Sequence, residues 1–237
     1  MTQTFVHRFE RAVGAICPEI QARSAKPRRV KIDDRAMWWE LSCCILSSQV
    51  PYSVAAAAAD RIDHAKLLLA SKVNPDTLAT ALENILAHRM LVEDRFVRYR
   101  FPASRAKQLA ACHSAVRRQG ESLSGLLARF SDALEARRWL VDNIPGVGPK
   151  QASMFLRNVG LTYSLAILDR HVLKYMSALG ITRHAQPFVS GLSTYLRLEQ
   201  MLREHAKGIG YEVGLLDWAI WIVMRADKQP NTELNFA

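Results

Sequence analysis

The chain has 237 residues, of which 49% are hydrophobic and 23% are charged, a balance typical of a globular protein. Collagen-like, low-complexity and fully disordered chains are therefore excluded, and one large domain or two small ones are expected. Lysine and arginine number 32 against 22 acidic residues, which gives a formal net charge of +10. This excess favours a polyanion such as nucleic acid as the partner. An anionic membrane surface, or no polyanionic partner at all, are the alternatives.

The cysteines indicate packing rather than metal binding. Cys43 and Cys44 are neighbours within an apolar run, and the sequence contains no Cys-x-x-Cys pair of the kind that binds zinc or an iron–sulfur cluster. The first residues lack an apolar stretch of signal-peptide type, and no segment approaches the roughly 20 apolar residues of a membrane span. We therefore expect a reduced, soluble, cytoplasmic protein with no membrane contact.

Short amphipathic helices account for most of the chain, because alternating strand patterns are nearly absent. Residues 2–16 are predicted to form a helix, and residues 21–31 a basic, irregular linker. A longer helical pattern begins at Asp33 and restarts after Pro51. Asn74-Pro75-Asp76 is typical of a helix start, with an Asx cap, proline in the first turn and an acidic residue.

The second half of the chain continues this helical pattern. Glycines at the ends of three predicted helices are typical C-terminal stops. Helices are predicted from Pro102 to Gly120, after Ser131-Asp132, from the turn PGVGP to Gly160, from Asp169 to Gly180, and within 187–207 and 209–226. The expected fold is all-α, with about ten to twelve helices, and composition marks no domain boundary.

The most informative stretch joins two predicted helices through the turn Ile144-Pro-Gly-Val-Gly148. Ile144 and Val147 can insert into the core, while Gly146 and Gly148 permit positive φ and leave the backbone bare. Pro149 suits the first turn of the second helix. Bare N–H groups at a helix start bind anions, and a DNA phosphate fits there. An ordinary helix–helix connection is the alternative, and the net charge favours nucleic acid.

Lys150 lies in the first turn of that second helix, where the helix dipole disfavours a cation by roughly 0.3–1 kcal/mol. The same field favours the neutral amine, which is the nucleophilic form. A lysine that only pairs with phosphate or reaches solvent is the alternative. Asp169 follows nineteen residues later and caps a predicted helix. A carboxylate facing the amine could also move protons or stabilise a sugar cation, since glycosidic bonds break through such states.

These motifs resemble a known family. IPGVGPK followed by LDRH is similar to the helix-hairpin-helix, Gly-Pro-Asp superfamily of DNA glycosylases, and GPKQASMFLRNVG with AILDRHVL resembles its second type of 8-oxoguanine DNA glycosylase/lyase. Three further stretches resemble the same type: ELSCCILSSQ (40–49), RYRFPASRAKQL (98–109) and LLDWAIWI (215–222). The chain lacks the four-cysteine array of the endonuclease III branch, and Lys150 separates it from the adenine-mismatch branch.

The resemblance implies a role for each matching position. Lys150 would be the Schiff-base nucleophile and Asp169 the catalytic carboxylate. The turn at Ile144–Gly148 would hold a DNA phosphate and a monovalent cation on its carbonyls, with no catalytic metal and no cofactor. The remaining expected site residues are Phe101, Trp221 and Asp217 in the base pocket, and Gln49, Gly146, Val147, Gly148 and Arg157 at the DNA. Core packing is the alternative for Phe101 and Trp221, and a plain turn residue for Gln49.

The resemblance also implies an architecture and a reaction. Two helical subdomains, 48–158 with the helix-hairpin-helix and 1–47 with 159–237, would flank a cleft. A nucleoid-associated monomer would excise an oxidised purine, 8-oxoguanine first, from duplex DNA and nick the strand. A non-catalytic DNA-binding protein and a monofunctional glycosylase for another base are the alternatives. The added N-terminal residues and the tail 225–237, where the family often ends in a basic residue, leave the excised base open.

Overall fold

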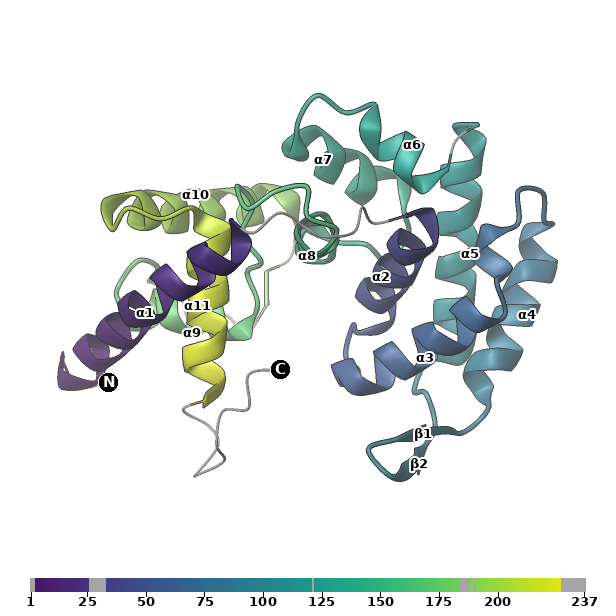
Figure 1. Ribbon diagram of the computed structural model, residues 1–237, viewed down its shortest axis with the longest axis horizontal. Helices are drawn as coiled ribbons and strands as arrows, with labels where there is room; N and C mark the ends of the chain where they lie inside the picture. The colour runs from purple at the N-terminus through teal and green to yellow at the C-terminus, as the bar shows by residue number, and fades with distance from the viewer. Residues whose placement is uncertain (1–2, 26–32, 121, 184–187, 190, 227–237) are drawn as a thin grey trace. The chain divides into compact units, whose positions relative to one another are not determined.

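The computed structural model describes residues 3–25, 33–120, 122–183, 188–189 and 191–226 (Figure 1). Within these ranges it contains eleven α-helices, one short 3-10 helix and one two-stranded hairpin, which confirms the all-helical prediction. The chain divides into two compact units. We call Val30–Leu161 the central unit and Met1–Arg29 with Thr162–Ala237 the terminal unit, and each is described by itself.

The central unit contains seven α-helices, the 3-10 helix and the hairpin. The predicted cap at Asn74 is confirmed, because its Oδ1 accepts hydrogen bonds from the backbone N–H groups of Asp76 and Thr77 at 2.9 and 3.2 Å. The elements are α2 (Asp34–Leu46), α3 (Tyr52–His64), η1 (Leu67–Leu69), α4 (Pro75–Ala87), β1 (Met90–Val92), β2 (Arg95–Val97), α5 (Pro102–Arg118), α6 (Leu123–Ala128), α7 (Ala133–Asn143) and α8 (Pro149–Asn158).

Helix α2 forms the centre of this unit. All residues from Leu41 to Leu46 are buried, so the helix has no solvated side at its C-terminal end. It packs against α3, α5, α6 and α8. The boundary expected at 47/48 would have separated α2 from these partners, whereas the structure places the first boundary at 29/30. The second lies at 161/162 rather than 158/159.

The hairpin β1–β2 is a feature that the sequence pattern did not reveal. Its strands are antiparallel, with Leu91 opposite Phe96, and the turn residues Glu93 and Asp94 have φ of 48° and 62°. Two consecutive positive φ values are typical of a type I′ turn, which usually carries Asn-Gly. Because Glu-Asp stands there instead, the usual sequence signal for the turn is absent.

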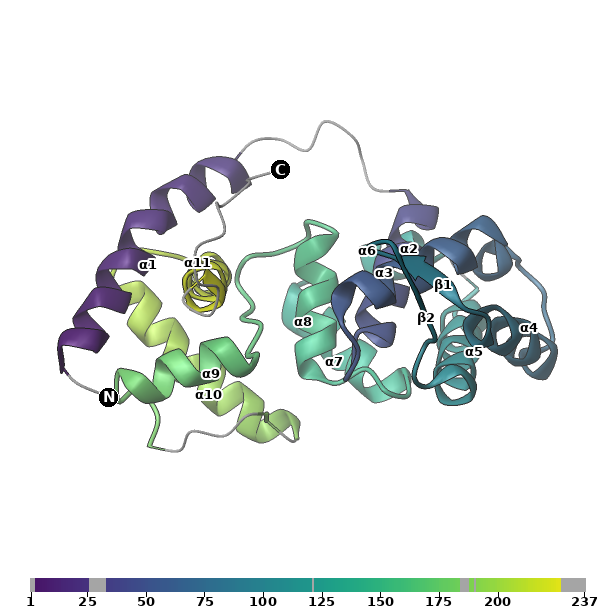
Figure 2. The same ribbon diagram turned by 90° about the horizontal axis from the view of Figure 1, so that it is seen from below.

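The terminal unit is built from α1 (Gln3–Ser24), α9 (Arg170–Ala178), α10 (Leu192–Gly208) and α11 (Val213–Ala226). Helix α11 packs against the other three, and Figure 2 shows α11 end-on between α1 and α9. Helix α1 continues past the predicted end at residue 16, because Cys17 and Ile20 are buried in the core of this unit. Residues 26–31 of the predicted linker lie outside the described ranges.

Helix α11 begins in very close contact with the segment that precedes α9. The backbone N–H of Gly214 donates to the carbonyl of Tyr163 at 2.9 Å. A Cβ atom at position 214 would stand 2.5 Å from that oxygen and 2.9 Å from the carbonyl oxygen of Leu165. Both obstacles are backbone atoms, so glycine is required for this approach.

We predict that Gly214→Ala lowers the free energy of unfolding by about 1–3 kcal/mol, because the added methyl group pushes α11 away from residues 163–165. The matched control is Gly208→Ala, since a Cβ at that helical position meets nothing within 4 Å. It should leave stability unchanged or raise it by up to about 1 kcal/mol. Urea denaturation of the two variants provides the comparison, and equal stabilities would contradict the role assigned to Gly214.

Candidate functional site

The turn between α7 and α8 has the expected helix-hairpin-helix form. Ile144 and Val147 are only 2% and 4% exposed, so both insert into the core as predicted. Gly146 has φ of +82°, a left-handed conformation that favours glycine. A Cβ on Gly146 would lie 2.4 Å from Nε2 of Gln108. The backbone conformation therefore favours glycine at this position, and a side chain there would also have to displace the Gln108 amide.

Gly148 has a different role from the one predicted. Its φ is −87° and its ψ is 176°, which any residue adopts, so the expected positive φ is wrong here. Gly148 is the N-cap of α8 and provides no side chain to accept from the first turn. The N–H groups of Lys150 and Gln151 thus lack the usual capping acceptor and are available to an anion.

A surface hollow of about 420 Å³ lies at this turn, lined by residues 141–148. Backbone carbonyl oxygens are the kind of ligand that suits a monovalent cation. The cation expected at Ile144–Gly148 stays a prediction. Among the described residues, no group of three or more His, Cys, Asp or Glu side chains is arranged to hold a metal ion.

Lys150 is half-buried at the start of α8, on the helix that packs against α2. Burial and then the nearby Glu40 carboxylate raise the pKa of the Cys44 thiol well above its usual range, while the positive charge of Lys150 acts in the opposite direction. Cys44 therefore stays protonated. Since the thiolate is the reactive form of cysteine, Cys44 does not compete with the amine as a nucleophile.

The far end of α8 is attached to α2 through Glu40. Its Oε1 accepts a hydrogen bond from Nδ2 of Asn158 at 2.7 Å, and the Cys44 thiol donates to the same atom at 3.6 Å. Arg157 lies in the last turn of α8, at the opposite end of the helix from the hairpin turn. Its expected contact with DNA stays a prediction.

Gln49 occupies the turn between α2 and α3 in a strained conformation. Its φ is +62°, which is uncommon for a residue other than glycine, and its side chain is exposed. Such strain concentrates at functional positions. An exposed glutamine at the tip of a turn is compatible with insertion into a DNA gap, and that role stays a prediction.

Arg105 links the Gln49 turn to the helix-hairpin-helix turn at Ile144–Gly148. Its Nη2 donates to the carbonyl of Ser48 at 3.2 Å and its Nη1 donates to Oε1 of Gln108 at 2.5 Å. Gln108 is the side chain that packs against Gly146. Arg105 is 9% exposed, so its guanidinium group is held within the protein. It is a structural residue that connects the two turns.

The two aromatic residues expected to line the base pocket lie in different units. Phe101 is half-buried just before α5, and its ring lies under the guanidinium carbons of Arg100 and Arg105 at 4.9 and 5.6 Å. Trp221 is 37% exposed on α11, and Arg225 lies over its ring at 4.9 Å. Trp221 is thus the more exposed of the two, and the base-pocket role of both rings stays a prediction.

Asp169 is the N-cap of α9, as predicted. Its Oδ1 accepts from the backbone N–H groups of His171 and Val172 at 2.8 and 2.9 Å. The side chain is half-buried, and the two bonds to Oδ1 fix its orientation.

Asp217 lies in the interior rather than in an accessible pocket. It is 1% exposed, and its Oδ2 accepts a hydrogen bond from the backbone N–H of Ile167 at 2.5 Å. Its contact is therefore with the segment leading to Asp169. No sequence motif signalled this bond, because it joins residues fifty positions apart.

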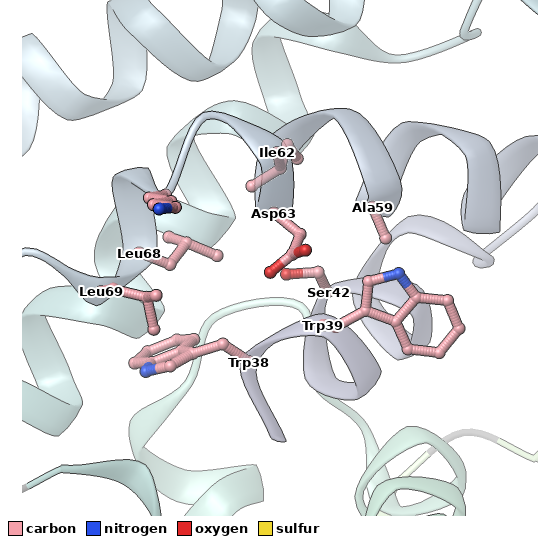
Figure 3. Close-up of a pocket in the computed structure, with 9 residues that line it drawn as sticks. Trp38, Trp39, Ser42, Ala59, Ile62, Asp63, Leu68 and Leu69 are labelled. Carbon is pink, nitrogen blue, oxygen red and sulfur yellow. The ribbon is translucent and has the colours of Figure 1, made fainter. Parts of the chain in front are cut away.

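A small cavity between α2, α3 and η1 is lined by Trp38, Ser42, Asp63 and Leu68 among others (Figure 3). Trp38 Nε1 and Ser42 Oγ are buried and have no hydrogen-bond partner in the described part of the chain. The cavity measures about 10 Å³, room for about one water molecule. It is far too small for a nucleobase, so it is not the base pocket.

Comparison with known proteins identifies the family. The chain matches the model of a family described as 8-oxoguanine DNA glycosylase over residues 20–211. The chain belongs to this family. It is 31% identical over 206 residues to an 8-oxoguanine DNA glycosylase/AP lyase of Sulfurisphaera tokodaii. The aligned residues cover 85% of this chain and 88% of that relative. It is 32% identical over 201 residues to the 8-oxoguanine DNA glycosylase/AP lyase of Thermoplasma volcanium, and the aligned residues cover 83% of this chain and 85% of that relative.

Solved structures agree with this membership. The crystal structure of the 8-oxoguanine DNA glycosylase of Thermotoga maritima is similar to the chain with a TM-score of 0.67 and 26% identity, covering 94% of this chain and 97% of that one. The Methanocaldococcus jannaschii 8-oxoguanine glycosylase/lyase, crystallised with a 15mer DNA containing 8-oxoguanine, has a TM-score of 0.65 at 23% identity and supports the fold alone. No helix among the described residues is long and apolar enough to span a membrane.

We predict that Arg105→Met lowers the free energy of unfolding by about 2–4 kcal/mol, because the Ser48 carbonyl and the Gln108 amide lose a charged partner. Lys107→Met, on the exposed side of the same helix, is the control and should change stability by less than about 0.5 kcal/mol. Thermal and urea denaturation measure both. Equal effects of the two substitutions would show that Arg105 does not connect the turns.

Proposed function

We propose that this protein is a bifunctional DNA glycosylase and AP lyase that excises 8-oxoguanine from duplex DNA through a Schiff base on Lys150. The observation that carries the proposal is the position of Lys150, half-buried in the first turn of α8 and directly after the glycine turn. The family membership supports the same reaction, since the relatives bear the names of both activities. The protein acts as a monomer on DNA.

The helix-hairpin-helix turn binds the DNA backbone. The uncapped N–H groups of Lys150 and Gln151 form an anion site at the helix start. The net charge of +10 adds long-range attraction to the polyanion. Contacts of this kind fix the register of the protein on the duplex without reading its sequence.

The target base has to leave the helical stack, because its glycosidic carbon cannot be reached inside the duplex. Unstacking costs a few kcal/mol. Gln49, exposed at the tip of its turn, fills part of the gap that the extruded nucleotide leaves. The rings of Phe101 and Trp221 supply stacking surfaces for the base, and stacking on an aromatic ring is worth about 1–3 kcal/mol per base.

The neutral amine of Lys150 attacks C1′ of the sugar while the bond from C1′ to N9 of the base breaks. The base departs with the bonding electrons and takes up a proton. Loss of the amine proton and opening of the sugar ring give the Schiff base. Removal of a proton from C2′ then expels the 3′ phosphate by β-elimination, which nicks the strand, and water finally releases the lysine.

Asp169 supplies the negative charge that this reaction needs. The sugar develops positive charge as the base departs, and a carboxylate stabilises such an oxocarbenium-like state. The two backbone N–H donors on Oδ1 hold the side chain in one orientation before the reaction begins, which is the kind of preorganisation that accelerates chemistry.

Borohydride trapping tests the role of Lys150. Incubation with a duplex containing 8-oxoguanine and borohydride should give a covalent adduct with the wild-type protein and none with Lys150→Gln. Lys72→Gln removes the same charge from an exposed lysine of the central unit and should trap normally. Binding without an adduct or base release would make the protein a DNA-binding module. Free base without a nick would indicate a monofunctional glycosylase, and a screen of other lesions would identify its substrate.

Asp169→Asn tests the carboxylate separately from the helix cap. Asparagine is as good an N-cap as aspartate, so the variant should fold with nearly unchanged stability. The single-turnover rate of base release should fall about a hundredfold or more, because the negative charge is lost. Asp33→Asn, at the N-cap of α2, makes the same change elsewhere and should retain the wild-type rate. A fast Asp169→Asn enzyme would remove Asp169 from the mechanism.

A further inference from the structure

The segment that leads to Asp169 belongs to no helix and has no neighbouring strand among the described residues. Residues 163–168 run between α10 and α11 of the terminal unit, and most of them are buried. A buried backbone segment without strand partners needs other acceptors and donors for its peptide groups. Side chains from the two helices provide them.

Helix α10 provides three side chains spaced four residues apart along one of its faces. Arg203 Nη2 donates to the carbonyl of Ser164 at 2.9 Å. Glu199 Oε1 accepts from the N–H of Ala166 at 2.8 Å. Residues four apart share a helix face, so this stripe runs alongside the segment.

Tyr195 completes the stripe at the end nearest Asp169. Its hydroxyl donates to the carbonyl of Ala166 at 2.7 Å and accepts from the N–H of Leu168 at 3.0 Å. One hydroxyl therefore bridges two peptide groups in the way that a neighbouring strand would.

Helix α11 holds the segment through the residues in between. Asp217 accepts from the N–H of Ile167, and the N–H of Gly214 donates to the carbonyl of Tyr163. The N–H groups of Ala166 and Leu168 therefore bind α10, while that of Ile167 binds α11. We call Tyr195, Glu199, Arg203 and Asp217 the polar ladder.

The last bond of the polar ladder is to Leu168, the residue before Asp169. The Asp169 N–H donates to the carbonyl of Ile167 at 2.9 Å, so the backbone position of Asp169 follows from that of residues 166–168. Glu199 and Asp217 are each 1% exposed. Burying a carboxylate is costly even when it is hydrogen-bonded, and apolar side chains would fill the same space more cheaply. This cost in stability is expected where the backbone of residues 166–168 must follow one defined path.

We propose that the polar ladder is a positioning device for Asp169, with Tyr195 and Glu199 as positioning residues for base excision. This inference rests on the proposed function, because it assigns a purpose to the placement of its carboxylate. A displacement of about 1 Å can cost about a hundredfold in rate. Loss of a ladder bond should therefore reduce the rate of the chemical step more than it reduces DNA affinity or stability.

Tyr195→Phe tests the ladder by removing a single oxygen atom. We expect the single-turnover rate of 8-oxoguanine release to fall about tenfold or more, with the Kd for the lesion duplex within about twofold of wild type. Tyr175→Phe is the matched control, since Tyr175 is also 1% exposed in the terminal unit and its hydroxyl faces His205 at 3.4 Å instead of the segment. It should keep the wild-type rate.

Hydrogen–deuterium exchange provides a readout that is independent of activity. The amides of Ala166, Ile167 and Leu168 should exchange faster in Tyr195→Phe and in Glu199→Ala, whereas Glu199→Gln retains an acceptor and should restore both protection and rate. If the wild-type protein releases no base, the proposed function fails, and the exchange data still test the ladder. Unchanged exchange and an unchanged rate in Tyr195→Phe would overturn the inference.

Discussion

The reversal of the backbone at Gly146 is the constraint on which the central unit depends. A side chain at this position would need a strained φ and would have to displace the Gln108 amide. Because the chain turns there without a side chain, α8 begins at Pro149 with uncapped N–H groups, and Lys150 lies in its first turn. This one turn therefore produces two features. The first is an anion site at the start of α8, and the second is an amine placed where the helix dipole disfavours its positive charge. Arg105 extends the same constraint to the Gln49 turn through Ser48 and Gln108.

The terminal unit solves a related problem by a different physical means. The carboxylate of Asp169 follows a segment that belongs to no helix or strand, and side chains of α10 and α11 bind the peptide groups of that segment one after another. Asp217, which the family resemblance places near the base, lies within this arrangement. Its bond to Ile167 links the helix that carries Trp221 to the backbone that carries Asp169.

Local signals predicted most of the fold, because helix starts and stops depend on a few neighbouring residues. Asn74 and Asp169 cap their helices as expected, and Gly160 and Gly180 end theirs with positive φ. The hairpin at 90–97 was missed, since its turn lacks glycine and its strands are short. The prediction ended α1 at residue 16, which is too early, because the helix continues and buries Ile20 in the core. In the site, the burial of Arg105 and the partners of Glu199 and Asp217 depend on contacts between distant segments, which periodicity does not encode.

Peptide mapping of the borohydride-trapped complex tests the central claim most directly, because it reports which amine is bonded to the sugar. Modification of Lys150 blocks trypsin at that residue, so the sugar-bearing peptide should run from Trp139 to Arg157 and fragment to a mass increment on Lys150. An adduct on any other lysine or on the N-terminal amine would show that the amine at the start of α8 is not the nucleophile, and the account given for the glycine turn would then be contradicted.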